Sequence, residues 1–227
     1  TTTSEDKLKR KITEINMRII TGSARGTKLA TLEGDATRPT TDRVKEALFS
    51  MIQFDIEGRN VLDLFGGCGQ LALEALSRGA AKATIIDQSR DATNIIIENA
   101  KKTHLFDRCR ISTADYTSFI RGAAKKEKYD IIFLDPPYNT GLLHASLKAL
   151  HDAELFAPGA YIVCETDCDI PSKATRARKD EEITAEYIMK DVFGGSESLK
   201  NEFEVIRSTL YGRTRITLLT PKTGDAE

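Results

Sequence analysis

Short apolar runs alternate with stretches of helical periodicity from residue 60 to residue 165 of the chain. The runs are rich in β-branched residues, which is typical of buried strands in a parallel sheet. They predict strands at residues 60–65, 83–87, 109–112, 129–134 and 161–165. Residues 70–78, 89–102 and 140–151 have the spacing of amphipathic helices. This alternation predicts an α/β fold with a doubly wound, mostly parallel sheet and helices on both faces.

The ends of the chain add less regular elements. Residues 41–54 place apolar side chains at i, i+3, i+4, i+7 and i+8, which predicts a helix behind a threonine cap. Residues 18–29 hold two β-prone pieces around a Gly/Ser/Arg turn, so we expect a small basic hairpin there. Near the other end we expect a strand at residues 210–220 and a loop at residues 190–200, which contain Gly194-Gly195-Ser196.

The chain has 227 residues, of which 40% are apolar and 30% charged. These values are typical of a globular protein and exclude a disordered or collagen-like chain. No apolar run reaches about 18 residues and the N-terminus is polar and charged, so we expect no membrane span, no secretory signal and a cytoplasmic protein. The cysteines and histidines lack the spacing of metal ligands, so we expect reduced thiols and no metal.

Charge is unevenly distributed along the chain, although 33 basic and 34 acidic residues give a net charge of −1. Residues 7–45 contain ten Lys or Arg and four Asp or Glu, which leaves 23 basic and 30 acidic residues elsewhere. A basic segment can bind phosphates even when the whole chain is nearly neutral. We therefore expect residues 1–40 to form a basic N-terminal extension with a hairpin, and residues 41–227 to form the main domain.

A glycine-rich turn follows the first predicted strand. The strand contains Val61-Leu-Asp-Leu-Phe65 and continues into Gly66-Gly-Cys-Gly69, ahead of a helix. Small residues in such a turn let a nucleotide-like ligand approach the backbone. Asp87 ends the next strand 18 residues after Gly69, where an acid can bind ribose hydroxyls. On these features alone, an NAD-dependent oxidoreductase is a fair interpretation.

Asp63 discriminates between NAD and S-adenosylmethionine. A carboxylate at the end of the first strand would repel the pyrophosphate of a dinucleotide. It suits the cationic amino-acid end of S-adenosylmethionine, and Asp87 suits the ribose of the same molecule. Asp115 follows the third strand and could accept a hydrogen bond from the adenine amino group. A helix N-cap is an almost equally good interpretation of Asp115.

The strand at 129–134 ends in the tetrapeptide Asp135-Pro136-Pro137-Tyr138. Open α/β sheets bind ligands at this end of their strands. The prolines fix the backbone and remove its donors, so the Asp135 carboxylate and the Pro136 carbonyl form a rigid pair of acceptors. An exocyclic amine supplies two matching donors, and Tyr138 could stack on the base, which is worth about 1–3 kcal/mol. The tetrapeptide therefore favours methyl transfer to a base amine, by positioning and electrostatics.

With these residues in place, the sequence resembles class I S-adenosylmethionine-dependent methyltransferases, which have a Rossmann-like fold. Residues 17–29, 61–65 and 73–80 and the stretch Thr37-Arg-Pro-Thr-Thr-Asp-Arg-Val-Lys-Glu-Ala-Leu-Phe49 resemble the bacterial RsmD family. The resemblance covers about residues 17–170 and resumes at 203–219. The chain departs from the family's pattern in its Gly-Gly-Cys-Gly turn, in having Asp87 where Glu is common, and at residues 171–202.

The resemblance implies methylation of the N2 amine of a guanine in 16S ribosomal RNA, with that RNA, the small subunit or an assembly intermediate as partner. It implies a target-base site made of Asp135, Pro136, Pro137 and Tyr138. The implied cofactor site comprises Asp63, Phe65, Gly66, Gly67, Gly69, Asp87, Gln88, Asp115 and Tyr116.

A basic N-terminal extension then has a function, because a flipped guanine needs flanking phosphates held in place. The expected phosphate contacts are Arg25, Lys28, Arg38 and Arg43, although Arg43 is equally well interpreted as a solvated helix residue. Three alternatives remain at this point. They are a DNA or RNA adenine-N6 methyltransferase, which also uses Asp-Pro-Pro-Tyr, an NAD-dependent oxidoreductase, and a non-catalytic RNA-binding assembly factor.

Overall fold

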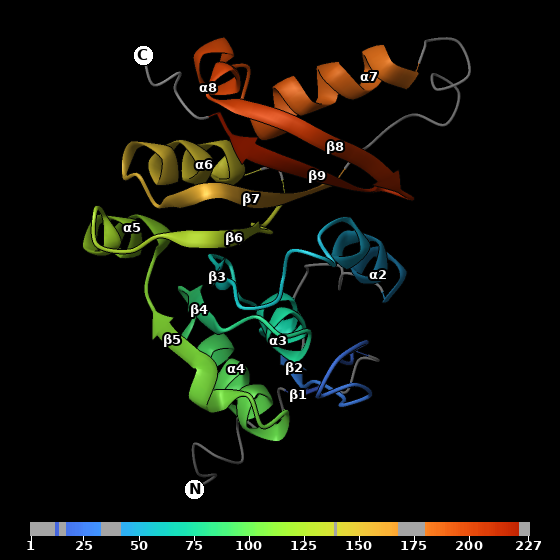
Figure 1. The fold of residues 1–227 in the computed structure, drawn as a ribbon, viewed down its shortest axis with the longest axis vertical. Coiled ribbons are helices and arrows are strands. Elements are labelled where there is room, and N and C mark those ends of the chain that lie inside the picture. Colours follow the sequence, from blue (N-terminus) through green and yellow to red (C-terminus); the bar gives the residue numbers. More distant parts are fainter. Residues whose placement is uncertain (1–11, 14–16, 33–41, 139, 168–179, 223–227) are drawn as a thin grey trace, which may run out of the picture. The chain divides into compact units, whose positions relative to one another are not determined.

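The structure is a computed structural model that describes residues 12–13, 17–32, 42–138, 140–167 and 180–222 (Figure 1). The chain forms two compact units, Thr1–Tyr116 and Thr117–Glu227. Arg38, which was expected to contact RNA, lies outside the described residues. In the part of the chain that is described, no helix has the length and apolar composition needed to span a bilayer.

The first unit is built on three parallel strands. They are β3 (Asn60–Asp63), β4 (Lys82–Asp87) and β5 (Cys109–Thr113), in the order β5-β4-β3. The helix α3 (Gln70–Ser77) follows β3, and α4 (Arg90–Lys102) follows β4, with a short 3-10 turn, η1 (Phe106–Arg108), before β5. Because the strands are parallel, Asp63 and Asp87 end their strands at the same edge of the sheet.

Both helices begin and pack as their sequences dictate. Every residue of α3 is buried, which its run of alanines and leucines permits. The helix α4 begins behind Ser89, whose side chain accepts a hydrogen bond from the N–H of Ala92, as predicted. Its buried residues Ile95, Ile96 and Ala100 lie on one face, and the last turn carries Lys101 and Lys102, which suit the negative end of the helix dipole.

The N-terminal segment forms the expected hairpin. Arg18 pairs with Lys28 in an antiparallel bridge, and the short strands β1 (Ile12–Thr13) and β2 (Thr31–Leu32) pair beyond it. The helix α2 (Asp42–Met51) follows, and its buried residues include Val44, Leu48 and Phe49.

Buried polar side chains bond the hairpin to α3 and α4. The Glu74 carboxylate accepts hydrogen bonds from the N–H groups of Ile20 (2.7 Å) and Thr21 (3.0 Å), and Ser77 Oγ accepts one from the N–H of Ala24 (3.0 Å). The amide of Asn99 bonds both backbone groups of Ala30, at 2.8 and 2.9 Å. The basic segment is therefore an integral part of the first unit.

The second unit combines parallel and antiparallel strands. Its order is β6 (Tyr129–Leu134), β7 (Phe156–Asp167), β9 (Thr214–Pro221) and β8 (Phe203–Tyr211), and only β6 and β7 are parallel. Its helices are α5 (Tyr116–Ala123), α6 (Leu142–Asp152), α7 (Asp180–Tyr187), the π-helical η2 (Ile188–Val192) and α8 (Glu197–Asn201). In α6, Leu143, Leu147 and Leu150 are buried on one face, as predicted.

The α/β class and the predicted strands and helices from residue 60 to residue 165 are confirmed, with shifted ends, of which the largest is the start of β7 at Phe156. The helix α5 and the turn η1 were not predicted. Two predictions at the C-terminal end were wrong. The region 190–200, predicted as a loop, contains the end of η2 and all of α8 except its last residue, because the buried Val192, Phe193 and Leu199 give it an apolar face. Residues 210–220 belong to two strands, since Gly212 and Arg213 form a tight turn between β8 and β9.

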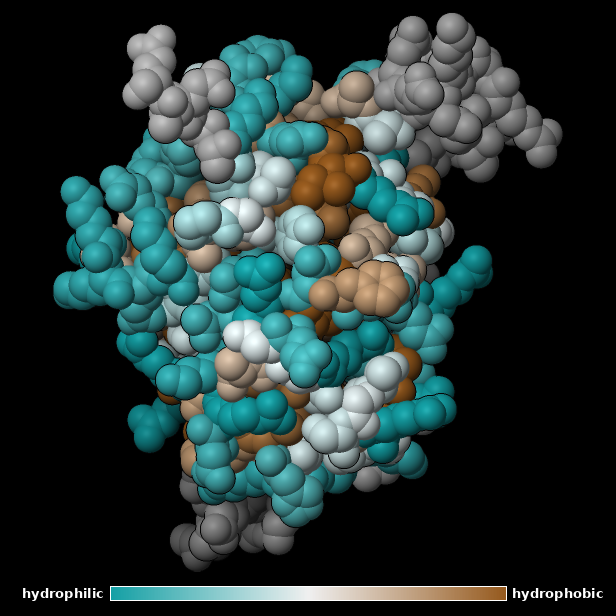
Figure 2. All heavy atoms as spheres, in the orientation of Figure 1, coloured by the Kyte–Doolittle hydropathy of each residue, from teal (hydrophilic) through white to brown (hydrophobic). Residues whose placement is uncertain are grey.

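Hydrophilic residues cover most of the face seen in Figure 2, and apolar side chains show only between them. Phe54, which is 90% exposed, is the most exposed large hydrophobic residue among those described. Isolated apolar side chains of this kind are normal on protein surfaces.

Gly22 and Gly26 offer a matched test of how the hairpin is attached. Both have a left-handed backbone, with φ of +87° and +84°, but a Cβ at Gly22 would lie 1.8 Å from the Ser77 carbonyl oxygen, whereas one at Gly26 would meet nothing within 4 Å. We expect Gly26→Ala to lower the free energy of unfolding by about 1–2 kcal/mol through backbone strain alone. Gly22→Ala should cost at least about 1–3 kcal/mol more, because it adds a steric clash.

Denaturant unfolding of the two alanine variants measures both losses. Equal losses would mean that the hairpin does not pack on α3 through Gly22.

Candidate functional site

Asp63 ends β3 as a buried carboxylate with unused acceptor capacity. Its residue is 1% exposed, and its Oδ1 atom makes no hydrogen bond with the described residues. Burial, with a smaller contribution from the charge of Asp87, raises the pKa of Asp63 to about 7, although backbone N–H groups of Ala72 and Phe65 oppose the rise. Such a buried acceptor is a natural partner for a cationic hydrogen-bond donor on a ligand.

Asp87 ties the glycine turn to the next helix. Its two carboxylate oxygens accept hydrogen bonds from the N–H of Gly67 (2.9 Å) and of Ser89 (2.8 Å). Each oxygen can accept more than one bond, so these contacts leave capacity for a ligand hydroxyl. The side chain therefore both shapes the turn and can take part in binding.

Each glycine of the turn lacks a side chain for a different structural reason. A Cβ at Gly66 would lie 2.6 Å from Ile85 Cγ2, so the turn packs directly on β4. Gly67 has a φ of +55°, and a Cβ there would meet nothing within 4 Å, which leaves open space over the backbone. Gly69 is the N-cap of α3 at a φ of +81° and makes no side-chain cap bond. The N-terminal end of α3, where the N–H of Ala72 bonds Asp63, carries the positive end of the helix dipole and can serve an anionic ligand group.

Gln70 is a site residue that the sequence reasoning missed. It is the first residue of α3, is 8% exposed, and its Oε1 atom makes no hydrogen bond with the described residues. Only its position directly after the glycine turn could have indicated a role.

The remaining residues expected to bind the cofactor lie near the ends of β4 and β5. The rings of Phe65 and Tyr116 contact each other with centroids 6.0 Å apart. Gln88 is exposed directly after β4, and Asp115 is exposed directly before the first residue of α5. The first unit thus contains every residue expected at the cofactor site.

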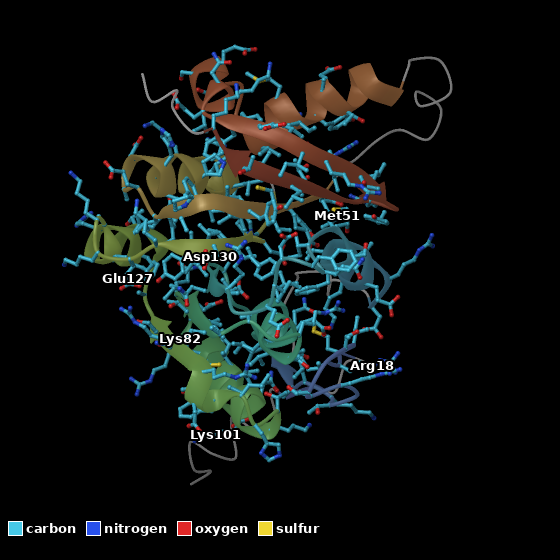
Figure 3. All side chains as sticks on the ribbon, in the orientation of Figure 1. Arg18, Met51, Lys82, Lys101, Glu127 and Asp130 are labelled. Carbon is cyan, nitrogen blue, oxygen red and sulfur yellow. The ribbon has the colours of Figure 1, made fainter. Side chains whose placement is uncertain are left out.

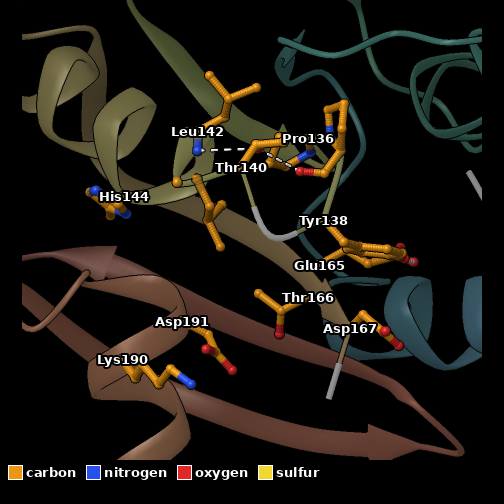
Figure 4. A pocket seen from close by; sticks show the side chains of 13 residues that line it. Pro136, Tyr138, Thr140, Leu142, His144, Glu165, Thr166, Asp167, Lys190 and Asp191 are labelled. Carbon is orange, nitrogen blue, oxygen red and sulfur yellow. Dashed lines mark hydrogen bonds between the residues drawn. The ribbon is translucent and has the colours of Figure 1, made fainter. Parts of the chain in front are cut away.

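The second unit contains a pocket of about 240 Å³ at the carboxyl end of β6 and β7 (Figure 4). Pocket volumes of about 300–1,000 Å³ hold drug-sized ligands, so this one suits a single planar group. Pro136, Pro137 and Tyr138 line it, so three of the four residues of the tetrapeptide form its wall. The rest of the lining comes from Thr140, Gly141, Leu142, Leu143, His144, Glu165, Thr166, Asp167, Lys190 and Asp191.

The loop after the prolines is held by its own hydrogen bonds. Thr140 Oγ1 donates to the Pro137 carbonyl (2.6 Å) and accepts from the N–H of Leu142 (3.4 Å). These bonds join the tetrapeptide to the start of α6, so the pocket wall is fixed in place.

Tyr138 donates its hydroxyl to the Glu165 carboxylate at a distance of 3.0 Å. Burial, followed by the negative charges of Glu165 and Asp135, raises the pKa of Tyr138 far above its usual range, so the hydroxyl stays protonated. Figure 4 shows the two side chains together near the carboxyl end of β7, and Lys190 and Asp191 of η2 line another part of the pocket. The sequence reasoning missed Glu165 because it treated this residue only as the end of a strand.

The strand register explains why Glu165 lies beside the tetrapeptide. Leu134 of β6 is paired with Cys164 of β7. Asp135 directly follows β6 and Glu165 follows Cys164 within β7, and the charges of both carboxylates act on the Tyr138 hydroxyl. Thr166 follows, 8% exposed, with an Oγ1 atom that has no hydrogen-bond partner among the described residues.

The residues expected to contact RNA phosphates belong to the first unit. Arg25 and Lys28 of the hairpin and Arg43 of α2 are exposed. Arg18, also exposed, donates to Asp42 at 2.9 Å. Figure 3 shows Arg18 on the opposite side of this unit from Lys82, the first residue of β4.

A protein family described as conserved hypothetical protein 95 matches residues 17–186. The ribosomal RNA small subunit methyltransferase D of Escherichia coli K12 is 39% identical over 67% of this chain and 76% of its own length. The solved structure of Escherichia coli yhhF, provisionally named a methyltransferase, is 30% identical with a TM-score of 0.69 and covers 92% of this chain and 99% of its own. A structure of SMU.776 with bound SAH shares the fold, at 15% identity and a TM-score of 0.61 over 86% of this chain and 53% of its own.

The raised pKa of Asp63 predicts a pH dependence of stability. The native group titrates near pH 7 and the ordinary carboxyl near 3.8, so between these values the native state binds more protons than the unfolded state. The free energy of unfolding should therefore fall as pH rises through this window, by as much as about 4 kcal/mol. Asp63→Asn should flatten that fall.

Urea unfolding at several pH values from 4 to 8 provides the measurement. Asp107→Asn, at an exposed carboxylate of η1, is the matched control and should keep the wild-type profile. An Asp63→Asn profile that coincides with the wild type would show that Asp63 does not titrate as described.

Proposed function

We propose, because the chain belongs to the RsmD family, that it transfers a methyl group from S-adenosylmethionine to the N2 amine of a guanine in 16S ribosomal RNA. The observation that carries this proposal is the buried Oδ1 atom of Asp63, which lies beside a glycine turn and makes no hydrogen bond with any residue that the structure describes. A cation with N–H donors satisfies that atom, whereas the pyrophosphate of NAD would be repelled by it.

The residues of the first unit fit S-adenosylmethionine group by group. Asp63 would accept from the ammonium, and the N-terminal end of α3 would bind the carboxylate. Asp87, which accepts a hydrogen bond from the Gly67 N–H, would bind the ribose hydroxyls. The open space over the Gly67 backbone leaves room for the ribose. Gln88, Asp115 and the rings of Phe65 and Tyr116 remain for the adenosine. When bound, S-adenosylmethionine supplies an electrophilic methyl group.

The residues of the second unit would hold and activate the target amine. An amine conjugated to a purine ring is a poor nucleophile, because its lone pair is delocalised into the ring. Accepting its hydrogens at the Asp135 carboxylate and the Pro136 carbonyl draws the nitrogen toward sp³ geometry and restores the lone pair. Asp135 is then in position to take the proton that the amine releases. Positioning and fixed acceptors supply most of the catalysis in this scheme.

The exposed Arg25, Lys28 and Arg43 would bind phosphates on either side of the target nucleotide. Contacts of this kind orient the RNA and contribute little sequence information. The target guanine has to be unpaired or flipped, because its N2 amine otherwise lies in the groove of a duplex.

The reaction product provides the direct test of the proposal. We expect the protein, incubated with labelled S-adenosylmethionine and undermethylated small-subunit RNA or particles, to yield N2-methylguanosine after digestion to nucleosides. Asp135→Asn should lower the rate by at least about 100-fold, since it removes the charged acceptor. Recovery of N6-methyladenosine alone would assign the adenine alternative instead.

Salt dependence tests the phosphate contacts separately from the chemistry. Lys28→Ala should weaken binding to small-subunit RNA and reduce the slope of log binding constant against log salt by about 0.7–0.9. Lys82→Ala removes an exposed lysine from the other side of the same unit and should leave the slope unchanged. Equal slopes in the two variants would mean that Lys28 is only a solvated residue.

A further inference from the structure

The pocket lined by Pro136, Pro137 and Tyr138, called the base pocket below, is rich in carboxylates. Glu165, Asp167 and Asp191 line it, and Asp135 lies close enough for its charge to act on the Tyr138 hydroxyl. Asp167 is engaged by Arg213, whose Nη2 donates to it at 2.8 Å. Glu165 differs from Asp167 in that it is 3% exposed and is held by Tyr138. An ionised carboxylate only accepts hydrogen bonds, so this wall recognises donors.

Leu134 and Cys164 are the last registered pair of β6 and β7, and Asp135 and Glu165 each come directly after it. The charges of both carboxylates act on the Tyr138 hydroxyl, so the two acids lie close to the same group. Neighbouring strands lie about 4.8 Å apart, so two adjacent acceptors at this edge can reach two adjacent donors on one ring. Guanine has such a pair, because its ring N1–H is next to its N2 amine. In adenine the atom next to the amine is an unprotonated N1, which is an acceptor and would be repelled by a carboxylate.

We propose that Glu165 selects guanine over adenine by accepting a hydrogen bond from the ring N1–H while Asp135 holds the exocyclic amine. Tyr138 is then also a positioning residue, because its hydroxyl fixes the Glu165 carboxylate in the pocket. Thr166, whose Oγ1 makes no hydrogen bond with the described residues, follows Glu165 and also lines the pocket. This inference rests on the proposed function and adds the residue that decides between the two purines.

The analogue 2-aminopurine isolates the N1 contact. It keeps the amine at position 2 but lacks the N1 hydrogen, so its N1 is an acceptor. Small-subunit RNA is prepared with guanine or with 2-aminopurine at the methylated position, once nucleoside mapping has located that position. The measured quantity is the ratio of kcat/KM for guanine to kcat/KM for 2-aminopurine in each variant. Comparing this ratio between variants cancels the intrinsic difference in amine reactivity.

Glu165→Gln keeps the shape of the side chain and adds an amide donor that can pair with an unprotonated N1. We expect the guanine preference to fall at least about tenfold relative to the wild type, since a good hydrogen-bonded pair discriminates by this much or more. Glu204→Gln makes the same chemical change at an exposed carboxylate of β8 and should leave the ratio unchanged.

Tyr138→Phe provides a second, independent variant that keeps the aromatic ring. It should also lower the guanine preference, by a smaller factor, because Glu165 loses the hydroxyl that fixes it. If thermal unfolding indicates that Glu165→Gln does not fold, Tyr138→Phe decides the question alone.

The outcomes separate the two proposals. If the wild type forms N2-methylguanosine and the ratio is unchanged in each folded variant, the role of Glu165 is wrong and the proposed function stands. If the wild type methylates no guanine, the proposed function itself fails. A ratio that falls in the Glu165 and Tyr138 variants, and not in Glu204→Gln, supports the inference.

Discussion

Two hydrogen bonds to the Asp87 carboxylate hold together the edge of the first unit where a ligand would bind. They come from the N–H groups of Gly67 and Ser89, and so join the loop after β3, the end of β4 and the start of α4. With the loop fixed in this way, and with Gly66 packed against Ile85, Asp63 lies in the interior beneath it. The raised pKa of Asp63 is therefore a consequence of how the turn is closed. Binding sites commonly contain such a locally unfavourable group, whose cost is offset when the ligand supplies its partner.

The same unit explains how a nearly neutral chain can carry a basic surface. The hairpin is bonded to α3 by Glu74 and Ser77, and Lys45 donates to the Arg18 carbonyl from a fully buried position. These contacts are buried polar pairs, which are costly to break because a charge is left without a partner. Removing the hairpin would therefore damage the fold around α3 as well as the basic surface. Single exposed side chains such as Lys28 are the better probes of RNA binding.

The sequence was most informative where function depends on short-range order. The end of a strand, a glycine turn and a proline-fixed tetrapeptide are each encoded within a few residues, so the amino-acid pattern alone places Asp63, Asp87 and Tyr138 at strand ends. The hairpin and the start of α4 at Ser89 were predictable for the same reason, because turn and cap residues act locally.

Glu165, Gln70 and Thr166 could not be assigned in this way. Their importance arises from register and burial, which depend on residues far away in the chain. The helical turns around Val192 and Leu199 were missed because the glycine pair at 194–195 is a strong loop signal, yet packing of the apolar side chains overrides it. The hairpin at Gly212 was missed because a two-residue turn leaves little trace between two apolar strands.

The pocket is rich in carboxylates and the hairpin is basic, and these opposite charges suit different parts of an RNA strand. RNA carries a negative charge on every nucleotide, so a pocket lined by Glu165, Asp167 and Asp191 repels the backbone while its acceptors attract the donor edge of a base. Under the proposed function, affinity for the polymer has to come from cations elsewhere, and the exposed Arg25, Lys28 and Arg43 are the candidates for these contacts. Separating the two tasks means that phosphate binding cannot substitute for base recognition. If Glu165 selects the base as proposed, a nucleotide that lacks two adjacent donors would gain nothing by entering the pocket, however well its backbone is held.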